Sequence, residues 1–243
     1  EMRGSVWRLS LDGHGCRLVQ DALRLDDHHS AASLAAELQG HVREAIASPH
    51  GNYVGPSQKV LPVPLAEFVV DELRGNAAET ARHRYGCRVL CRLIEHASSG
   101  ETTALLIDEV LAHARDLCAH VYGHYVIECV LEHGNPMQRS AVVHTLRSDM
   151  QRYTCDRNST YVFKAALTHC ARDDAEALVE ALLGDTDEML RLAEDQYGHH
   201  IVRALLRFPS ESLTLRAILQ RWESRLRENM YGCRVLEEMT HVA

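Results

Sequence analysis

The chain has 243 residues, of which 46% are hydrophobic and 25% are charged, a balance typical of a soluble protein with a packed core. It has no run of about 18 apolar residues and no secretory signal at its start, which argues against membrane insertion and export and favours the cytoplasm, with the nucleus or nucleolus as alternatives. The formal net charge of −8 disfavours an extended basic surface but leaves room for a local one.

The first residue is Glu rather than Met, so we expect the chain to be a piece of a longer one. Its eight cysteines are scattered rather than paired as CxxC, which favours reduced thiols over a disulfide framework. Cys118, Cys129, Cys155 and Cys170 lie in or beside apolar stretches, and we expect their thiols to be buried.

A short phrase recurs along the chain: an aromatic residue or His, then Gly, a variable residue, a planar residue and an apolar pair. Its seven copies occupy residues 14–19, 50–54, 85–90, 122–127, 158–163, 197–202 and 231–236, and the fifth copy replaces the first two residues by Asn and Ser. Successive variable residues are 36, 35, 37, 36, 39 and 34 positions apart, a period that indicates a repeat protein. We predict one domain, 1–243, with approximate repeats 3–38, 39–74, 75–111, 112–147, 148–185, 186–220 and a partial 221–243.

Each copy of the phrase opens a segment with helical periodicity, and a second amphipathic segment follows it. Asn-Pro at 135–136 and Pro-Ser at 209–210 are typical of helix starts. One helical hairpin cannot bury both of its faces, so neighbouring repeats must stack. The sequence therefore predicts an all-α fold, a curved right-handed α-solenoid (an armadillo-like superhelix) with a long concave surface. The apolar stripe after the fourth copy consists of Val126, Ile127, Val130 and Leu131.

The phrase brings three side chains together at the start of each helix. The variable residue (first position) and the residue four places later (fifth position) share one helix face, and the planar residue (second position) lies beside them. The first positions are Cys16, Asn52, Cys87, His124, Thr160, His199 and Cys233; the second positions are Arg17, Tyr53, Arg88, Tyr125, Tyr161, His200 and Arg234; the fifth positions are Gln20, Gln58, Cys91, Glu128, Lys164, Arg203 and Glu237.

All seven second positions are planar, although Leu or Val would pack better in a core. A ladder of planar side chains is suited to stacking on the bases of single-stranded RNA, while the first and fifth positions can hydrogen-bond a base edge. We therefore predict RNA binding at one base per repeat.

The stretches YGCRVLCRLIEH at 85–96 and VYGHYVIECVLEHG at 121–134 resemble repeats of the Pumilio, or PUF, family, and the resemblance spans nearly the whole chain. It implies an arc, usually of eight three-helix repeats, that binds the 3′ untranslated regions of messenger RNA with its N-terminal repeat on the 3′ base. It also implies translational repression or decay of the message, which would involve protein effectors. We expect the protein to be a monomer without a cofactor.

The resemblance also implies base preferences. Cys16 with Gln20 would favour adenine, and Cys233 with Glu237 would favour guanine. The other fifth positions depart from the family pattern, so the sequence predicts altered or relaxed base choice in the middle repeats.

The second repeat is interrupted by Gly-Pro-Ser at 55–57. Counting places Pro56 at the fifth position, whereas residue type places Gln58 there. Because Pro removes a helical hydrogen bond and clashes with the preceding turn, we predict a broken or kinked helix between Asn52 and Val60. Uracil binding by Asn52 is correspondingly weakened.

Other functions have less support in the sequence. Cys87, Cys91 and His83 lack the fourth ligand of a zinc site, and we predict no metal. The chain contains no phosphate-binding glycine loop and no GxSxG motif, so we predict that it is not an enzyme. Acidic residues of the second helices are expected on a solvated convex face: Glu72, Asp108, Glu109 and Asp187. A protein-interaction scaffold and a nonspecific nucleic-acid binder remain as alternatives.

Overall fold

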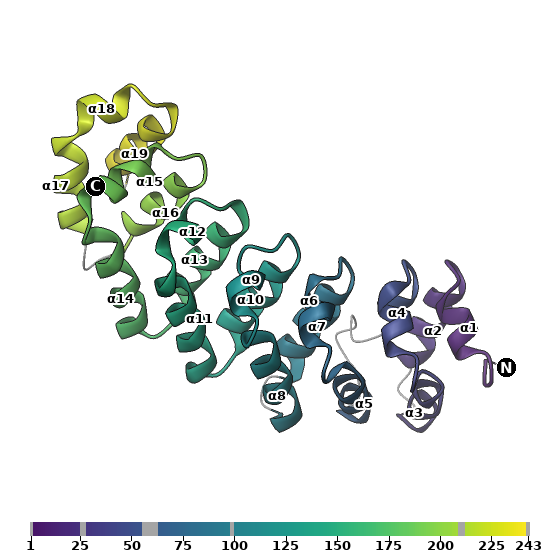
Figure 1. The fold of residues 1–243 in the computed structure, drawn as a ribbon. Coiled ribbons are helices and arrows are strands. Elements are labelled where there is room, and N and C mark those ends of the chain that lie inside the picture. Colours follow the sequence, from purple (N-terminus) through teal and green to yellow (C-terminus); the bar gives the residue numbers. More distant parts are fainter. Residues whose placement is uncertain (1, 25–27, 55–62, 98–99, 209–211, 242–243) are drawn as a thin grey trace. The chain divides into compact units, whose positions relative to one another are not determined.

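The computed structural model describes residues 2–24, 28–54, 63–97, 100–208 and 212–241, and every regular element in these ranges is helical (Figure 1). Contacts divide the chain into two compact units. Unit 1 consists of Glu1–His113 and Tyr125–Gln138, and unit 2 consists of Ala114–His124 and Arg139–Ala243. The predicted all-α class is confirmed, whereas the proposed repeat boundaries and the single domain stay predictions.

Among the described residues, the helices follow one another in threes with a final pair, and in most groups the first helix is shorter than the second. In order they are α1 (Val6–Ser10), α2 (Gly15–Leu23), α3 (His28–Ala36); α4 (Val42–Ala47), the 3-10 helix η1 (Gly51–Tyr53), α5 (Val63–Leu73); α6 (Ala77–Arg82), α7 (Gly86–Ala97), α8 (Glu101–Leu111); α9 (Ala114–Leu117), α10 (Gly123–His133), α11 (Pro136–Ser148); α12 (Met150–Thr154), α13 (Arg157–His169), α14 (Arg172–Leu183); α15 (Thr186–Glu194), α16 (Gly198–Leu205), α17 (Ser212–Arg221); α18 (Glu223–Arg227) and α19 (Met230–His241). The hairpin predicted from periodicity therefore lacked the short first helix.

The apolar stripes of the second helices form the core. Val126, Ile127, Val130 and Leu131 of α10 are fully buried, as the spacing predicted. Burying one such side chain stabilises the fold by about 1.5–3 kcal/mol. Because these residues face inward, the second position of each phrase is left on the exposed side of its helix.

The glycine of the phrase is required by close packing against the short first helix. A Cβ added at Gly15 would lie 2.5 Å from the carbonyl oxygen of Leu9, and one added at Gly198 would lie 2.9 Å from that of Leu192. The fifth repeat has Ser159 instead, whose hydroxyl donates to the carbonyl of Cys118 at 3.3 Å. The starts of α2 and α16 are thus fixed against the helix that precedes each of them, and the start of α13 is fixed against the preceding repeat.

In each of the first three repeats, a glutamate in or just after the third helix binds the turn that opens the same repeat. Each carboxylate accepts two backbone N–H groups of that turn, at 2.6–3.0 Å. Each turn begins at a glycine with φ between 74° and 82°, a conformation that other residues rarely adopt. The pairs are Glu37 with Gly4 and Val6, Glu72 with Gly40 and Val42, and Glu109 with Gly75 and Ala77.

The assignment of Glu72 and Glu109 to a merely solvated face was therefore wrong, because both are half-buried and bind the opening turn of their own repeat. Asp108 also has a partner, since the side-chain amide of Gln138 donates to it at 3.0 Å. Asp187 is exposed, as predicted, but it lies in the first turn of α15, a short first helix.

The predicted helix start at 135–136 is confirmed. Asn135 accepts the N–H of Gln138 at 2.9 Å, the Gln138 side chain accepts the N–H of Asn135 at 3.1 Å, and α11 begins at Pro136. This reciprocal pair is a capping box. The second predicted start, at 209–210, lies outside the described residues.

Candidate nucleic-acid interface

Every copy of the phrase is preceded by a side chain that caps its turn, and we call these seven side chains anchor residues. Each lies four positions before the first position and accepts the backbone N–H groups of the second and third residues after it, at 2.7–3.3 Å. The anchor residues are Asp12, Ser48, His83, His120, Asp156, Asp195 and Asn229. In the first copy, the bonds from the N–H groups of Gly15 and His14 hold the pKa of Asp12 below its ordinary value.

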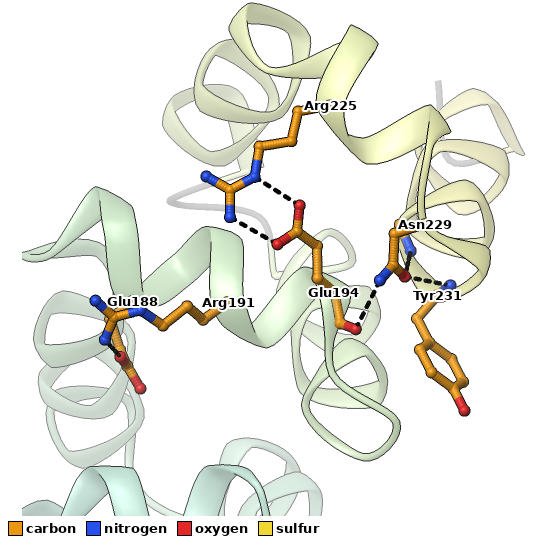
Figure 2. A network of polar contacts seen from close by, with 7 residues as sticks. Glu188, Arg191, Glu194, Arg225, Asn229 and Tyr231 are labelled. Carbon is orange, nitrogen blue, oxygen red and sulfur yellow. Dashed lines mark hydrogen bonds and ion pairs between the residues drawn. The ribbon is translucent and has the colours of Figure 1, made fainter.

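The last anchor residue is also tied to the preceding helix triplet, as Figure 2 shows. The side-chain amide of Asn229 donates to the carbonyl of Glu194 at 3.2 Å, while its oxygen accepts the N–H of Tyr231 at 2.8 Å. The Glu194 carboxylate receives two bonds of 2.7 Å from the guanidinium of Arg225. The start of α19 is therefore positioned by the C-terminal end of α15.

All first-position side chains donate a hydrogen bond to a carbonyl of their own repeat. Thr160 and Asn52 donate to their anchor residues at 2.8 Å. His124 and His199 do the same through Nδ1 at 2.8 and 3.0 Å. The thiols of Cys16, Cys87 and Cys233 approach turn carbonyls at 3.4–3.5 Å. Six of the seven are buried, and Cys233 is half-buried.

The two histidine first positions share one protonation pattern. A carbonyl oxygen only accepts, so Nδ1 of His124 and of His199 carries the proton. Burial lowers the pKa of both rings, so each is neutral at pH 7 and Nε2 is an acceptor. Nε2 of His199 is buried and has no hydrogen-bond partner among the described residues.

The second positions are exposed in all seven copies. The tyrosines at this register are about half exposed: Tyr53 at 45%, Tyr125 at 54% and Tyr161 at 47%. Within unit 2, the rings of His124 and Tyr161 are stacked at 6.0 Å and 25°. His200 lies 3.9 Å from the His199 ring, which in turn lies 5.0 Å from the Tyr231 ring. The structure thus places the predicted planar side chains on the surface; their contact with RNA stays a prediction.

The fifth positions differ from one another in their surroundings. Gln20 and Glu128 are half-buried, whereas Lys164 and Glu237 are exposed. The Cys91 thiol donates to the carbonyl of Tyr125 at 3.4 Å. A hydrogen bond with Cys129, together with burial, raises the pKa of Cys91.

Arg203 is also a fifth position, and its guanidinium is bound by a carboxylate of the next repeat. Nε and Nη2 of Arg203 donate to Glu238 at 3.1 and 2.7 Å. Arg203 and Cys91 are therefore held by neighbouring repeats, which local spacing did not reveal.

In the second repeat, the 3-10 helix η1 stands at the position of the second helix, where the other repeats have an α-helix. Asn52 is buried and Tyr53 is exposed, as at the other first and second positions. Gln58 and the predicted break between Asn52 and Val60 fall in 55–62, which lies outside the described residues.

Unit 2 has a pocket of about 540 Å³ at these positions. Its walls include the rings of Tyr161, His199, His200 and Tyr231, and the cations Lys164 and Arg234. None of the described residues that line it is Asp or Glu. Despite the net charge of −8, the surface here combines planar rings with positive charge.

The eight cysteines are free thiols; Cys118 is buried, but Cys155 is exposed, so its predicted burial was wrong. His83 accepts two backbone N–H groups through Nδ1, which explains it as an anchor residue. In the described part of the chain, no cluster of His, Cys, Asp and Glu is placed to hold a metal ion. None of the described helices has the length and apolarity needed to cross a membrane.

Comparison with known proteins gives matches to one family. A family model described as a Pumilio-family RNA binding repeat matches residues 5–32, 76–111, 113–146 and 229–239. Pumilio homolog 7 of Arabidopsis thaliana is 24% identical over 218 residues, covering 86% of this chain and 33% of that protein. Pumilio homolog 9 of the same plant is 23% identical over 212 residues, covering 85% and 37%. The chain thus spans about a third of the length of these relatives.

Solved structures share the fold at low identity. A crystal structure of PUF-8 in complex with PBE-RNA has a TM-score of 0.90 and 21% identity, covering 99% of this chain and 72% of that one. The Puf3 RNA binding domain bound to a Cox17 RNA 3′ UTR recognition sequence has a TM-score of 0.86 and 22% identity, covering 100% and 74%.

Proposed function

Because the chain belongs to the Pumilio family of helical-repeat proteins, we propose that it binds single-stranded RNA in a sequence-selective manner, one base per repeat. The observation that carries this proposal concerns the second positions. A planar side chain is exposed there in all seven copies, beside a first position that forms a hydrogen bond. Exposed planar groups at a regular spacing suit base stacking. The RNA in the similar structures of PUF-8 and Puf3 supports the same ligand class.

Base choice is proposed to be most defined at the two ends. Cys16 with Gln20 favours adenine and Cys233 with Glu237 favours guanine, with weaker uracil preference at Asn52. In the middle, His199 offers an acceptor at Nε2, while Arg203 is bound to Glu238. Such a pair differs from the family pattern, and we expect these repeats to accept more than one base.

The test is selection of RNA from a random pool, followed by titration of the selected RNA with variants. Arg88→Ala and Tyr125→Ala each remove one stacking group, and each should weaken binding by about 1–3 kcal/mol, roughly 5- to 150-fold. Arg74→Ala and Leu105→Ala are matched controls, because Arg74 is exposed at the end of α5 and Leu105 is 48% exposed on α8. Enrichment of no sequence, or equal losses in variants and controls, would refute the proposal.

The alternatives give different results in the same assays. A nonspecific binder would show a steep salt dependence without base preference, and a protein scaffold would bind no RNA. For the cell, we propose that the protein acts in the cytoplasm as a monomer that regulates messenger RNA through 3′ untranslated regions with protein effectors. Co-purification of bound messages from cells tests this, and recovery of no 3′ untranslated sequence would contradict it.

A further inference from the structure

A second pocket of unit 2, of about 160 Å³, is lined almost entirely by positively charged or titratable side chains. Lys164 comes from α13, His200 and Arg203 come from α16, and Arg207 follows in the turn after α16 (Figure 1). Ala204 completes the lining, and no described lining residue is acidic. The pocket therefore gathers cations from two consecutive repeats in a chain of negative net charge.

A single carboxylate, that of Glu238 on the adjoining helix α19, holds two of these cations in place. Glu238 is 8% exposed and accepts bonds from Nε and Nη2 of both Arg203 and Arg207, at 2.5–3.1 Å. No hydrogen bond among the described residues engages Nη1 of either guanidinium. Three cations (Lys164, Arg203 and Arg207) and one carboxylate give a net charge of +2. The two arginines are held in place by Glu238 before any ligand arrives.

The His200 ring lies close to the positive charges of this site. Burial is the main cause that lowers its pKa, and His199, Lys164, Arg203 and Arg234 add to the effect by repelling a proton. A bound anion would reverse that repulsion and favour the protonated ring. The pKa of the His200 ring should therefore rise when an anion binds, which makes anion binding measurable.

The chemistry of these groups favours a phosphate over a base edge. Arg recognises a guanine edge through two parallel donors, but Nε and Nη2 of Arg203 are already bound to Glu238. The N–H groups of Arg203 that Glu238 does not use, together with donors of Lys164 and Arg207, suit a small anion with several acceptor oxygens.

We propose that Lys164, His200, Arg203 and Arg207 form a phosphate-binding pocket, and that it holds a backbone phosphate of bound RNA. The second half of this statement rests on the function proposed above. It changes the role of Lys164 and Arg203, which local spacing had placed among the groups that read base edges.

The first test uses inorganic phosphate and needs no RNA. NMR of the His200 ring, assigned with His200→Gln, should show a pKa that rises as phosphate is added. Lys164→Gln should abolish this response while leaving the Glu238 pair intact, and Arg207→Gln should abolish it as well. Arg227→Gln is the matched control, because Arg227 and Arg207 have the same 67% side-chain exposure and each is paired with a glutamate. An unchanged His200 pKa, or an equal effect of Arg227→Gln, would overturn the pocket.

The second test measures RNA affinity against salt concentration for the same variants. Loss of one phosphate contact should lower the slope of log affinity against log salt by about 0.7 in Lys164→Gln and Arg207→Gln only. Equal effects on RNA with a 5′-hydroxyl and a 5′-phosphate support a backbone phosphate, whereas an effect confined to 5′-phosphorylated RNA overturns that part in favour of the terminal phosphate. RNA binding with unchanged slopes refutes the role of the pocket, whereas a phosphate response without any RNA binding refutes the proposed function instead.

Discussion

Removing the Glu109 carboxylate should weaken unit 1 at one defined contact, between α8 and the start of α6 within the third repeat. Glu109 accepts the N–H of Gly75 at 2.8 Å and that of Ala77 at 2.7 Å. Gly75 is exposed, so water can replace its bond, whereas Ala77 has no exposed surface. A lost bond to a charged acceptor costs about 1.5–3 kcal/mol where water cannot substitute. We therefore expect Glu109→Ala to lower the free energy of unfolding by about 2 kcal/mol.

Urea denaturation measures this loss, and amide hydrogen exchange locates it. At about 2 kcal/mol, exchange of the Ala77 amide should speed up by roughly 30-fold, because α6 is released at its first residue. Glu79→Ala is the matched control: its carboxylate lies on the same helix α6 with 81% of its side chain exposed, and it should change stability by no more than about 0.5 kcal/mol.

The conservative variant gives the sharpest refutation. Glu109→Gln keeps the shape of the side chain but replaces one acceptor oxygen by an NH₂ group, which would face a backbone N–H. It should therefore be nearly as destabilised as Glu109→Ala. Wild-type stability and wild-type exchange at Ala77 in Glu109→Gln would show that the bidentate contact does not hold α6.

Three further changes test other parts of the fold. Asp195→Ala removes the side-chain oxygen that accepts two backbone N–H groups and should cost about 1 kcal/mol in urea denaturation, with Asp195→Asn close to wild type; equal losses would contradict the anchor role. Gly86→Ala should cost about 1–3 kcal/mol by thermal melting, because its Cβ would meet the carbonyl of the preceding helix, whereas Gly184→Ala should be tolerated. The bound guanidiniums lower the pKa of Glu238, so its contribution is complete above about pH 4.3 and is lost as pH falls through the lowered pKa. The stability gap between wild type and Glu238→Gln should thus narrow only at acid pH; a gap independent of pH would refute it.

Spacing along the sequence predicted the features that each repeat carries within itself. The exposed second positions and the buried stripe at Val126 and Ile127 follow from helical periodicity, and the structure has both. The short first helices were missed because α6, with six residues, is shorter than the 11 to 18 residues over which periodicity is measured.

The anchor residues were missed for a different reason. These residues differ in type, and what they have in common is a side-chain atom that can accept a hydrogen bond, so they do not align as one motif. Examples are Asp12, Ser48, His83 and Asn229. Their constant distance before the first position was the signal that could have found them.

Contacts between residues far apart in the sequence, within one repeat or between two, could not be predicted from local patterns. Glu109 and Gly75 are 34 positions apart, and Arg203 and Glu238 are 35 apart. Both glutamates lie on helices where an exposed acidic residue would also be ordinary. Only the fold shows that each carboxylate has backbone or guanidinium donors opposite it.

The first-position hydrogen bonds limit how this protein can be redesigned. Cys, Asn, Thr and His all present a donor to a carbonyl of their own turn. An Asp or Glu placed there would set a carboxylate against that carbonyl, leaving both oxygens without a proton to share. The turn therefore limits which residues can be placed at the first position of a repeat. Base preference can be changed only among residues that can donate to the carbonyl of that turn.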